Sequence, residues 1–458
     1  MTDLPALTAA AFPAGTPLHA FFAWNEAGRG PDRRYVVAQD LHLLRRHFGP
    51  EGRKAGLVHL LVRPLIDARA PTRFHELDAA ALAALDGTPE LAAGEAVIDA
   101  LQASLGSADM AAHADLFQAF ERLDALIDLT ALAGTRPIHR RRAPRPGPRR
   151  ILVIKLSALG DFVQALGPMQ AIRRHHADDR LSLLTTAPYA EFARAAGLFD
   201  EVLIDRRPGF LDIPGWLALR RTLGSGRFDR VYDLQTSDRS SLYALLLPWR
   251  NQPEWSGIAR RCSHPHANLE RDPQHTIDKQ AEQLLMAGIF PTPLPSFSGA
   301  TRTLPEGLDG KRFALLIPGS SPRHPAKRWP AEHYGALAQK LAAQGLLPVV
   351  LGGRGEEALG DRIRALCPSA IDLVGKTDLA ALADLARAAT LSVGNDTGAT
   401  HIAAAGGHPV IVLFSAASEP LRCAPRGQVR VLSRPSLADL TVAEVLAAAL
   451  ETMPALTS

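Results

Sequence analysis

The chain has 458 residues, enough for about two to four domains of roughly 100–200 residues each. Its 47% hydrophobic and 21% charged residues are those of an ordinary soluble globular protein, and a net charge of only +4 excludes a strongly basic polyelectrolyte, so we expect no nucleic-acid partner. The three cysteines are far apart and form no CxxC pair, which argues against a disulfide framework or a cysteine-based zinc site and favours a reducing cytoplasm.

Residues 1–135 are predicted to form a mainly helical N-terminal extension of unknown role. The first residues lack a cationic start followed by an apolar core, and no stretch approaches about 18 uninterrupted apolar residues, so we expect neither a secretory signal nor a membrane span. Between residues 79 and 133, apolar residues recur at helical spacing and the segments end at glycine, which predicts two or three amphipathic helices. Residues 56–64 are a candidate strand.

Residues 136–150 read as an extended linker, because seven arginines and four prolines cannot build a core. Two interpretations stay open for this segment. It is either a solvated tether or a contact with an anionic membrane surface, where each basic residue contributes about 1 kcal/mol.

After the linker, short apolar runs alternate with helical stretches, which predicts parallel sheets with right-handed crossovers. A proline-rich segment near residue 295 separates two series, so we predict one Rossmann-like domain over residues 151–300 and a second over 311–458, facing a cleft. Ligands of such sheets bind outside the carboxyl ends of the strands, so the candidates lie just after each strand. The predicted strands are residues 151–156, 181–186, 201–206, 230–235, 313–319, 346–353, 370–375, 391–396 and 409–414.

Asp161 follows the first of these strands, in the turn LSALGD, and falls at the expected start of a helix. One interpretation is a helix cap, because Asp suits both the capping position and the positive end of the helix dipole. The other is a general base facing the cleft, whose ionised form the same dipole favours. Spacing alone leaves both open.

Polar and cationic residues follow the strands of the second series. Ser320 and Ser321, with Lys327 in the loop behind them, form either a phosphate cradle or a basic surface loop. Glu356 opens a helix and is either a cap or a ligand for ribose hydroxyls.

The segment GNDTGATHIAAAGG contains Asp396, Thr397, Gly398 and His401 at a predicted helix start. Small residues with Thr and His donors at a helix N-terminus suit a diphosphate, although each residue alone could be structural. The chain contains no HExxH, EF-hand, GxSxG or Walker motif, and its first strand is not followed by GxGxxG. Metallohydrolase, calcium-sensor, serine-hydrolase and P-loop functions therefore lack support, and a dinucleotide oxidoreductase is disfavoured.

Three segments, IKLSALGDFVQALGP, PGSSPRHPAKRWP and VGNDTGATHIAAAGGHPVIVLF, together resemble glycosyltransferase family 9, the ADP-heptose:lipopolysaccharide heptosyltransferases. The resemblance implies a GT-B fold, with the acceptor bound mainly by the first Rossmann-like domain and the donor by the second. It also implies an inverting transfer that needs no metal and no cofactor, from ADP-heptose or a similar nucleotide-sugar. Residues 415–420, SAASEP, depart from the GPT-like residues that family members often carry there.

The resemblance implies a role for each candidate. Asp161 would be the catalytic base, and Lys327 would neutralise the departing diphosphate. Ser320 and Ser321 would lie beside Lys327, Glu356 would hold the donor ribose, Asp396 would contact the donor sugar, and Thr397, Gly398 and His401 would line the diphosphate end.

The expected partners are a nucleotide-sugar donor and a glycolipid acceptor of the lipopolysaccharide core or lipid A type. The expected location is the cytoplasm, with peripheral contact to the anionic inner membrane. Two alternatives remain: the same fold glycosylating a protein or another surface polysaccharide, or a non-catalytic scaffold that binds nucleotide-sugars.

Overall fold

The computed structural model describes residues 147–453 apart from short gaps between 248 and 322, together with residues 86–104, residue 57 and isolated positions from 115 to 126. Helix α5, Pro89–Ser104, is one of the helices expected in the N-terminal extension. Leu57 is helical, so the strand expected over residues 56–64 is wrong at that position. Most of the extension, and residues 136–146 of the linker, lie outside the described residues, so their predicted roles stay predictions.

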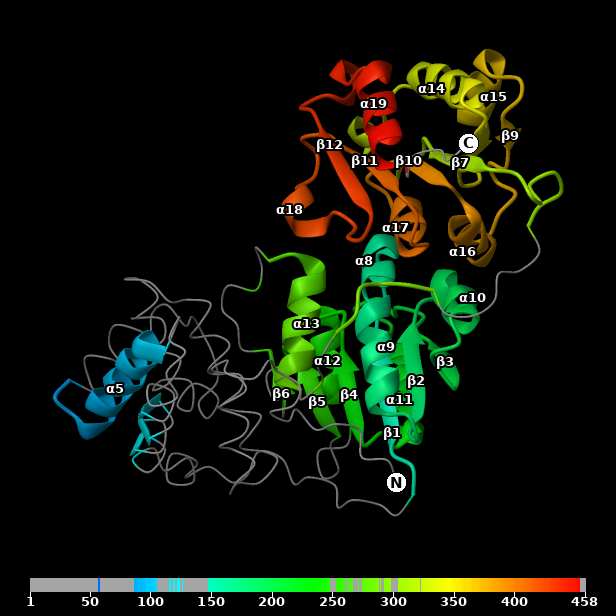
Figure 1. Ribbon diagram of the computed structural model, residues 1–458. Helices are drawn as coiled ribbons and strands as arrows, with labels where there is room; N and C mark the ends of the chain where they lie inside the picture. Colours follow the sequence, from blue (N-terminus) through cyan, green and yellow to red (C-terminus); the bar gives the residue numbers. More distant parts are fainter. Residues whose placement is uncertain are drawn as a thin grey trace.

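The first half of the described chain is built on a six-stranded parallel sheet in the order β3-β2-β1-β4-β5-β6 (Figure 1). Strand β1 lies in the interior of the sheet, and four of its five residues are buried. The strands are β1 Arg150–Ile154, β2 Arg180–Thr185, β3 Glu201–Ile204, β4 Arg230–Asp233, β5 Glu254–Gly257 and β6 His264–Pro265. The helices are α8 Leu159–Gln164, α9 Leu166–His175, α10 Ala187–Ala195, α11 Ile213–Gly226, α12 Asp238–Leu246 and α13 Thr276–Met286.

The second half repeats this plan with a parallel sheet in the order β12-β11-β10-β7-β8-β9. Its strands are β7 Phe313–Ile317, β8 Leu347–Val350, β9 Ile371–Asp372, β10 Leu391–Asn395, β11 Val410–Phe414 and β12 Val429–Ser433. Its helices are α14 Ala331–Ala343, α15 Glu357–Leu366, α16 Leu379–Ala388, α17 Gly398–Ala405, α18 Pro420–Cys423 and α19 Val442–Thr452, with short 3₁₀ turns at Pro325–Lys327 and Leu437–Asp439.

The nine strands predicted after the linker all form, and the described residues contain three further strands, β5, β6 and β12, that were not predicted. Strand β5 reads EWSG, in which only the tryptophan is a typical strand residue. Strand β12 lies at a sheet edge, and none of its residues is fully buried, so it lacks a strong apolar pattern. The exact domain boundaries stay a prediction, because residues 298–303 are not described.

The sheet order places the candidate residues at matching points of the two halves. In each sheet the strand order reverses beside the first strand of that half, between β1 and β4 and between β7 and β10. Such reversal points open a crevice at the carboxyl ends of the strands. Asp161 follows β1, Lys327 follows β7 and Asp396 follows β10. Figure 1 shows α8 directly beneath α17, and the two helices are in contact, so the segments that follow β1 and β10 lie next to each other.

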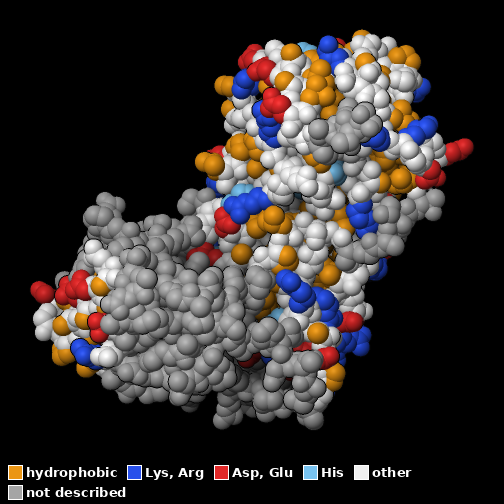
Figure 2. Space-filling model, in the orientation of Figure 1, with side chains coloured by type: hydrophobic (Ala, Val, Ile, Leu, Met, Phe, Trp, Pro, Cys, Tyr) orange, Lys and Arg blue, Asp and Glu red, His pale blue; other side chains and the backbone are white. Residues whose placement is uncertain are grey.

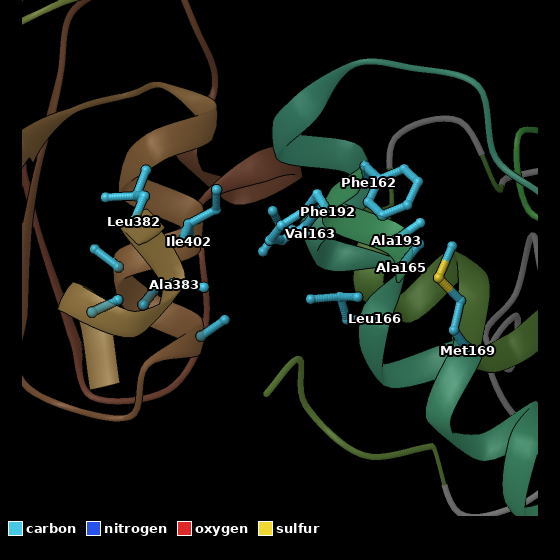
Figure 3. Close-up of a cluster of buried hydrophobic side chains, with 14 of the residues drawn as sticks. Phe162, Val163, Ala165, Leu166, Met169, Phe192, Ala193, Leu382, Ala383 and Ile402 are labelled. Carbon is cyan, nitrogen blue, oxygen red and sulfur yellow. The ribbon is translucent and has the colours of Figure 1, made fainter. Parts of the chain in front are cut away.

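One hydrophobic cluster contains buried side chains from both halves. Figure 3 shows Val163 and Leu166 on one side of the junction, facing Leu382 and Ile402 on the other. Phe162 instead packs on α10, where its ring stacks with Tyr189 at 5.5 Å between centroids. Helix α8 is therefore held by apolar contacts on two sides, which fixes the turn that carries Asp161.

The described part of the face shown in Figure 2 carries lysine, arginine and acidic side chains interspersed over both halves. Among the described residues of this face, charges of the two signs are mixed, and no large patch carries one sign only. This distribution agrees with the small net charge of the whole chain.

We expect Leu315→Ala to destabilise the second half. Leu315 is fully buried in the interior strand β7, and truncation of a buried leucine leaves a cavity that costs about 2–5 kcal/mol. Thermal unfolding measures the effect as a lower Tm. The matched control is Leu421→Ala, at a position 89% exposed, where the expected change is within about 0.5 kcal/mol. Equal shifts for the two variants would contradict the described core.

Candidate active site

Asp161 is the third residue of helix α8, and Ala158 occupies the capping position. The Ala158 N–H donates to Asp161 Oδ2 at 3.4 Å. The carboxylate therefore satisfies a backbone donor at the helix start while remaining partly exposed. The interpretation that Asp161 is itself the N-cap residue is therefore wrong, because Ala158 holds that position, but Asp161 still bonds the backbone of the helix start from the third helical position. This contact does not exclude a role as a base.

The fully buried Lys155 lies near Asp161 and near a second fully buried ionisable group, Asp233. Burial lowers the pKa of Lys155, and the negative charges of Asp161 and Asp233 act in the opposite direction. Burial raises the pKa of Asp233 to about 6, against hydrogen bonds from the N–H groups of Gln235 and Thr236. Sequence reasoning missed Lys155, although a lysine within the apolar run ILVIKL is a visible signal, since lysine is almost never fully buried without a partner.

Lys327 and Asp396 form an ion pair in the second half, with 2.6 Å between Nζ and Oδ2. Asp396 Oδ2 also accepts a hydrogen bond from Ser418 Oγ at 2.7 Å, and Asp396 Oδ1 lies 3.9 Å from His401 Nε2. Burial alone would raise the pKa of Asp396, but the contacts with His401, Lys327 and Ser418 outweigh it and hold this pKa below its usual value. Ser418, which sequence reasoning missed, belongs to the SAASEP segment that departs from the family pattern.

Glu356 connects the loops that follow β7 and β8. Its two carboxylate oxygens accept hydrogen bonds from the N–H groups of Ser320, at 3.1 Å, and Gly353, at 2.9 Å. Arg328, a further cation of the loop predicted as a phosphate cradle, donates to Ser320 Oγ at 3.0 Å and lies 3.5 Å from Glu356. Ser321 is exposed at the rim of the same loop. A Cβ atom at Gly319 would lie 2.3 Å from a Glu356 oxygen, so only glycine permits this approach.

The N-terminus of α17 contacts the N-terminus of α8 directly. Thr397 is the N-cap of α17, and a Cβ atom at Gly398 would lie 2.5 Å from Leu159 Cγ. His401, which is buried, lies against Gly160, where an added Cβ would be 3.0 Å from the imidazole ring. The segments after β1 and β10, predicted separately from sequence, are therefore in contact.

Gln164 joins the two halves through hydrogen bonds that define the tautomer of His401. Its Nε2 donates to the Cys423 carbonyl at 2.8 Å and lies 3.2 Å from His401 Nδ1. A carbonyl only accepts, so the first bond fixes the orientation of the amide, and His401 Nδ1 must accept. The proton of the neutral ring is then on Nε2, the atom that faces Asp396. A polar chain thus runs from α8 to Lys327.

Three of the predicted residues converge around Cys423. Burial raises the pKa of Cys423 to about 11, and the charges of Asp396, Lys327 and Asp161 all lie near enough to contribute. The structure therefore brings the candidate base of the first half close to the cation and the carboxylate of the second. Across residues 147–453, within the described positions, and in the described part of the extension, no group of three or more His, Cys, Asp or Glu side chains is arranged to hold a metal ion.

We expect Asp396→Asn to lower the Tm more at pH 7 than at pH 3. A carboxyl group whose pKa is depressed by folding contributes stability above its unfolded pKa of about 3.9, and this contribution is lost as the pH falls. The measurement is the Tm difference between wild type and variant across this range. The exposed Asp439→Asn serves as the control, with a small difference throughout. A gap that stays constant or widens toward acid pH would contradict the ion-pair assignment.

The sequence profile of glycosyltransferase family 9 (heptosyltransferase) matches residues 216–436. A lipooligosaccharide heptosyltransferase 2 of Haemophilus influenzae is 40% identical over 99 residues, which are 20% of this chain and 29% of the relative. The lipopolysaccharide core heptosyltransferase of the same organism is 27% identical over 305 residues, 61% of this chain and 82% of the relative.

The solved structure of Escherichia coli ADP-heptose lipopolysaccharide heptosyltransferase II superimposes with a TM-score of 0.52 at 23% identity, covering 65% of this chain and 97% of that one. The expected GT-B fold, with two Rossmann-like halves facing a cleft, is confirmed. In sequence and in fold, the chain is similar to glycosyltransferase family 9, the heptosyltransferase family.

Proposed function

We propose that this glycosyltransferase transfers a heptose, or a closely related sugar, from ADP-heptose to an acceptor of the lipopolysaccharide core or lipid A type, with inversion and without a metal. The curated relatives, which are named as lipopolysaccharide or lipooligosaccharide heptosyltransferases, support the choice of sugar and acceptor. The observation that carries the proposal is the contact between the turn holding Asp161 and the N-terminus of α17.

Asp161 acts as the general base in this proposal. It is partly exposed and belongs to the first half, which we assign to the acceptor. The acceptor hydroxyl loses its proton to the Asp161 carboxylate as its oxygen attacks the anomeric carbon. The new bond joins that oxygen to the anomeric carbon, and the bond from this carbon to the diphosphate oxygen breaks. One displacement from the opposite side inverts the configuration.

Lys327 and the N-terminus of α17 receive the negative charge of the leaving diphosphate. An ammonium group and a helix N-terminus both stabilise charge that develops on phosphate oxygens, the task that a metal performs in other enzymes. The ion pair with Asp396 holds the Lys327 side chain at this site. Thr397, Gly398 and His401 are assigned to the diphosphate end.

The remaining donor contacts are assigned to the neighbouring loops. Glu356 bridges the loops after β7 and β8, where a carboxylate can accept hydrogen bonds from ribose hydroxyls. Ser320 and Ser321 lie on the same loop as Lys327, and Asp396 is assigned to the donor sugar.

We propose that the reaction takes place at the cytoplasmic face of the inner membrane, where a glycolipid acceptor would be presented. None of the helices in the described part of the chain is long and apolar enough to cross a bilayer.

Asp161→Asn is expected to lower kcat by about 10²–10⁴-fold, because the amide cannot accept the acceptor's proton. The assay follows ADP release from ADP-heptose in the presence of a lipid A-type acceptor. Asp178→Asn, at an exposed carboxylate in the same half, is the matched control and should retain normal turnover. If Asp161→Asn keeps most of its activity, Asp161 is not the base.

ADP is expected to stabilise the protein more than UDP or GDP does. A ligand that binds only the folded state adds RT ln(1 + [L]/Kd), about 2.7 kcal/mol at a concentration of 100 Kd. Thermal-shift measurements with the three nucleotides test this preference. Lys327→Met should reduce the shift with ADP, whereas Lys311→Met, at an exposed position before β7, should not. Equal shifts with all three nucleotides would contradict ADP-heptose as the donor.

A further inference from the structure

The segment between β3 and α11 projects three apolar side chains into solvent. Phe210 is 92% exposed, Leu211 86% and Ile213 68%. Single exposed apolar residues are ordinary on protein surfaces, but three within four positions form a patch that needs a function. We call residues 206–213 the apolar tip.

The apolar tip stands on a well-ordered base. Arg239 donates to the Pro208 carbonyl at 2.9 Å, and Trp216 Nε1 donates to the Gly209 carbonyl at 3.0 Å. At the start of the segment, the buried Asp205 accepts a hydrogen bond from the Tyr243 hydroxyl. The backbone on both sides of Phe210 and Leu211 is therefore fixed, and the exposure of these side chains is part of the fold.

Helix α11 continues the same surface with a defined order of residue types. Ile213, Leu217, Arg220 and Arg221 are exposed and spaced at i, i+4, i+7 and i+8, which places them on one side of the helix. Leu219, on a different side, is buried. The exposed side is thus apolar near the tip and basic one to two turns farther along. Segments that lie at a membrane interface combine apolar side chains, which enter the acyl boundary, with basic side chains, which attract anionic lipids.

Four exposed arginines flank the apolar side chains. Within the described residues, no ion pair involves Arg206, Arg207, Arg220 or Arg221. Elsewhere on the surface, Arg194, Arg362, Arg430 and Arg434 each pair with a nearby glutamate. The one carboxylate between residues 206 and 221 is Asp212, which caps α11 by accepting from the Gly215 N–H at 2.9 Å. The surface therefore offers positive charge to an external anion.

The apolar tip lies at the same edge of the sheet as Asp161. Strands β1 and β3 are parallel members of one sheet, so the segments after them leave from the same side. Tyr189 is close enough to both Asp161 and Arg207 for their charges to act on its hydroxyl. The tip therefore lies beside the acceptor side of the cleft.

We propose that the apolar tip and the exposed side of α11 dock on an anionic lipid bilayer. Phe210, Leu211 and Ile213 enter the boundary between headgroups and acyl chains, and the four arginines contact lipid phosphates. A projecting apolar segment needs a complementary pocket on a protein partner, but a bilayer accepts it without one. The four arginines, which form no ion pair within the described residues, provide the charge complementarity. This docking is independent of which sugar is transferred.

The test measures binding of the full chain to vesicles of phosphatidylcholine mixed with phosphatidylglycerol, and to vesicles of phosphatidylcholine alone, by co-sedimentation. The double variant Phe210→Ser/Leu211→Ser should bind the anionic vesicles at least about tenfold more weakly, because each side chain loses the free energy of apolar burial. Leu421→Ser, at a position of similar exposure in the other half, should bind like wild type. Wild type should bind the neutral vesicles more weakly than the anionic ones.

A second variant separates the charges from the apolar contacts. Arg220→Ser/Arg221→Ser should weaken binding to anionic vesicles and reduce its salt dependence. Unchanged vesicle binding by the Phe210→Ser/Leu211→Ser variant would overturn the proposal. A wild-type dimer that the same substitutions convert to a monomer, without a change in vesicle binding, would show that the tip contacts a second copy of the chain and would also overturn it.

The thermal shift with ADP distinguishes this proposal from the proposed function. All tip variants should keep the wild-type shift, because the tip belongs to the first half and the donor residues belong to the second. A normal ADP shift without any effect of the tip substitutions on vesicle binding would reject the docking surface and leave the proposed function intact.

Discussion

The close approach of helix α8 to helix α17 is the contact on which the rest of the site depends. It requires a position without a side chain, since a Cβ atom at Gly398 would lie 2.5 Å from Leu159 Cγ. With this approach, Asp161 from one sheet comes near Lys327 and Asp396 from the other. Apolar side chains behind the contact, such as Val163 and Ile402, hold the two helices at this spacing. Glycine at position 398 therefore allows the two halves to meet at the candidate site.

Charge in the site is balanced across that contact. Asp396 accepts hydrogen bonds from Lys327 and Ser418 of its own half. It also lies beside His401, whose ring is hydrogen-bonded to Gln164 of the other half. On the opposite side, the buried Lys155 lies near both Asp161 and Asp233. Asp161 and Asp396 thus each have a cation nearby, and neither is isolated in the interior, where an unpaired charge would be costly.

The sequence was sufficient for the fold and for the position of most site residues, because both follow from local patterns. The nine apolar runs predicted nine strands. Parallel topology places the residues that follow such strands at one edge of the sheet, and Asp161, Lys327 and Asp396 were predicted as site residues for this reason. The partners that tie the site together were not accessible in this way. Gln164 and His401 are separated by 237 positions, and their contact depends on how the two halves pack. Ser418 lies in a segment whose residues differ from the family pattern. Of these residues, only Lys155 could have been recognised from the sequence, as a lysine within an apolar run.

The bond between Gln164 and His401 makes the orientation of one side chain depend on both halves of the chain. The Cys423 carbonyl fixes the Gln164 amide, and the amide in turn fixes which nitrogen of the His401 ring accepts. The opposite nitrogen of that ring, Nε2, then faces Asp396. The geometry around Asp396 in the second half is thus set in part by an amide that belongs to the first.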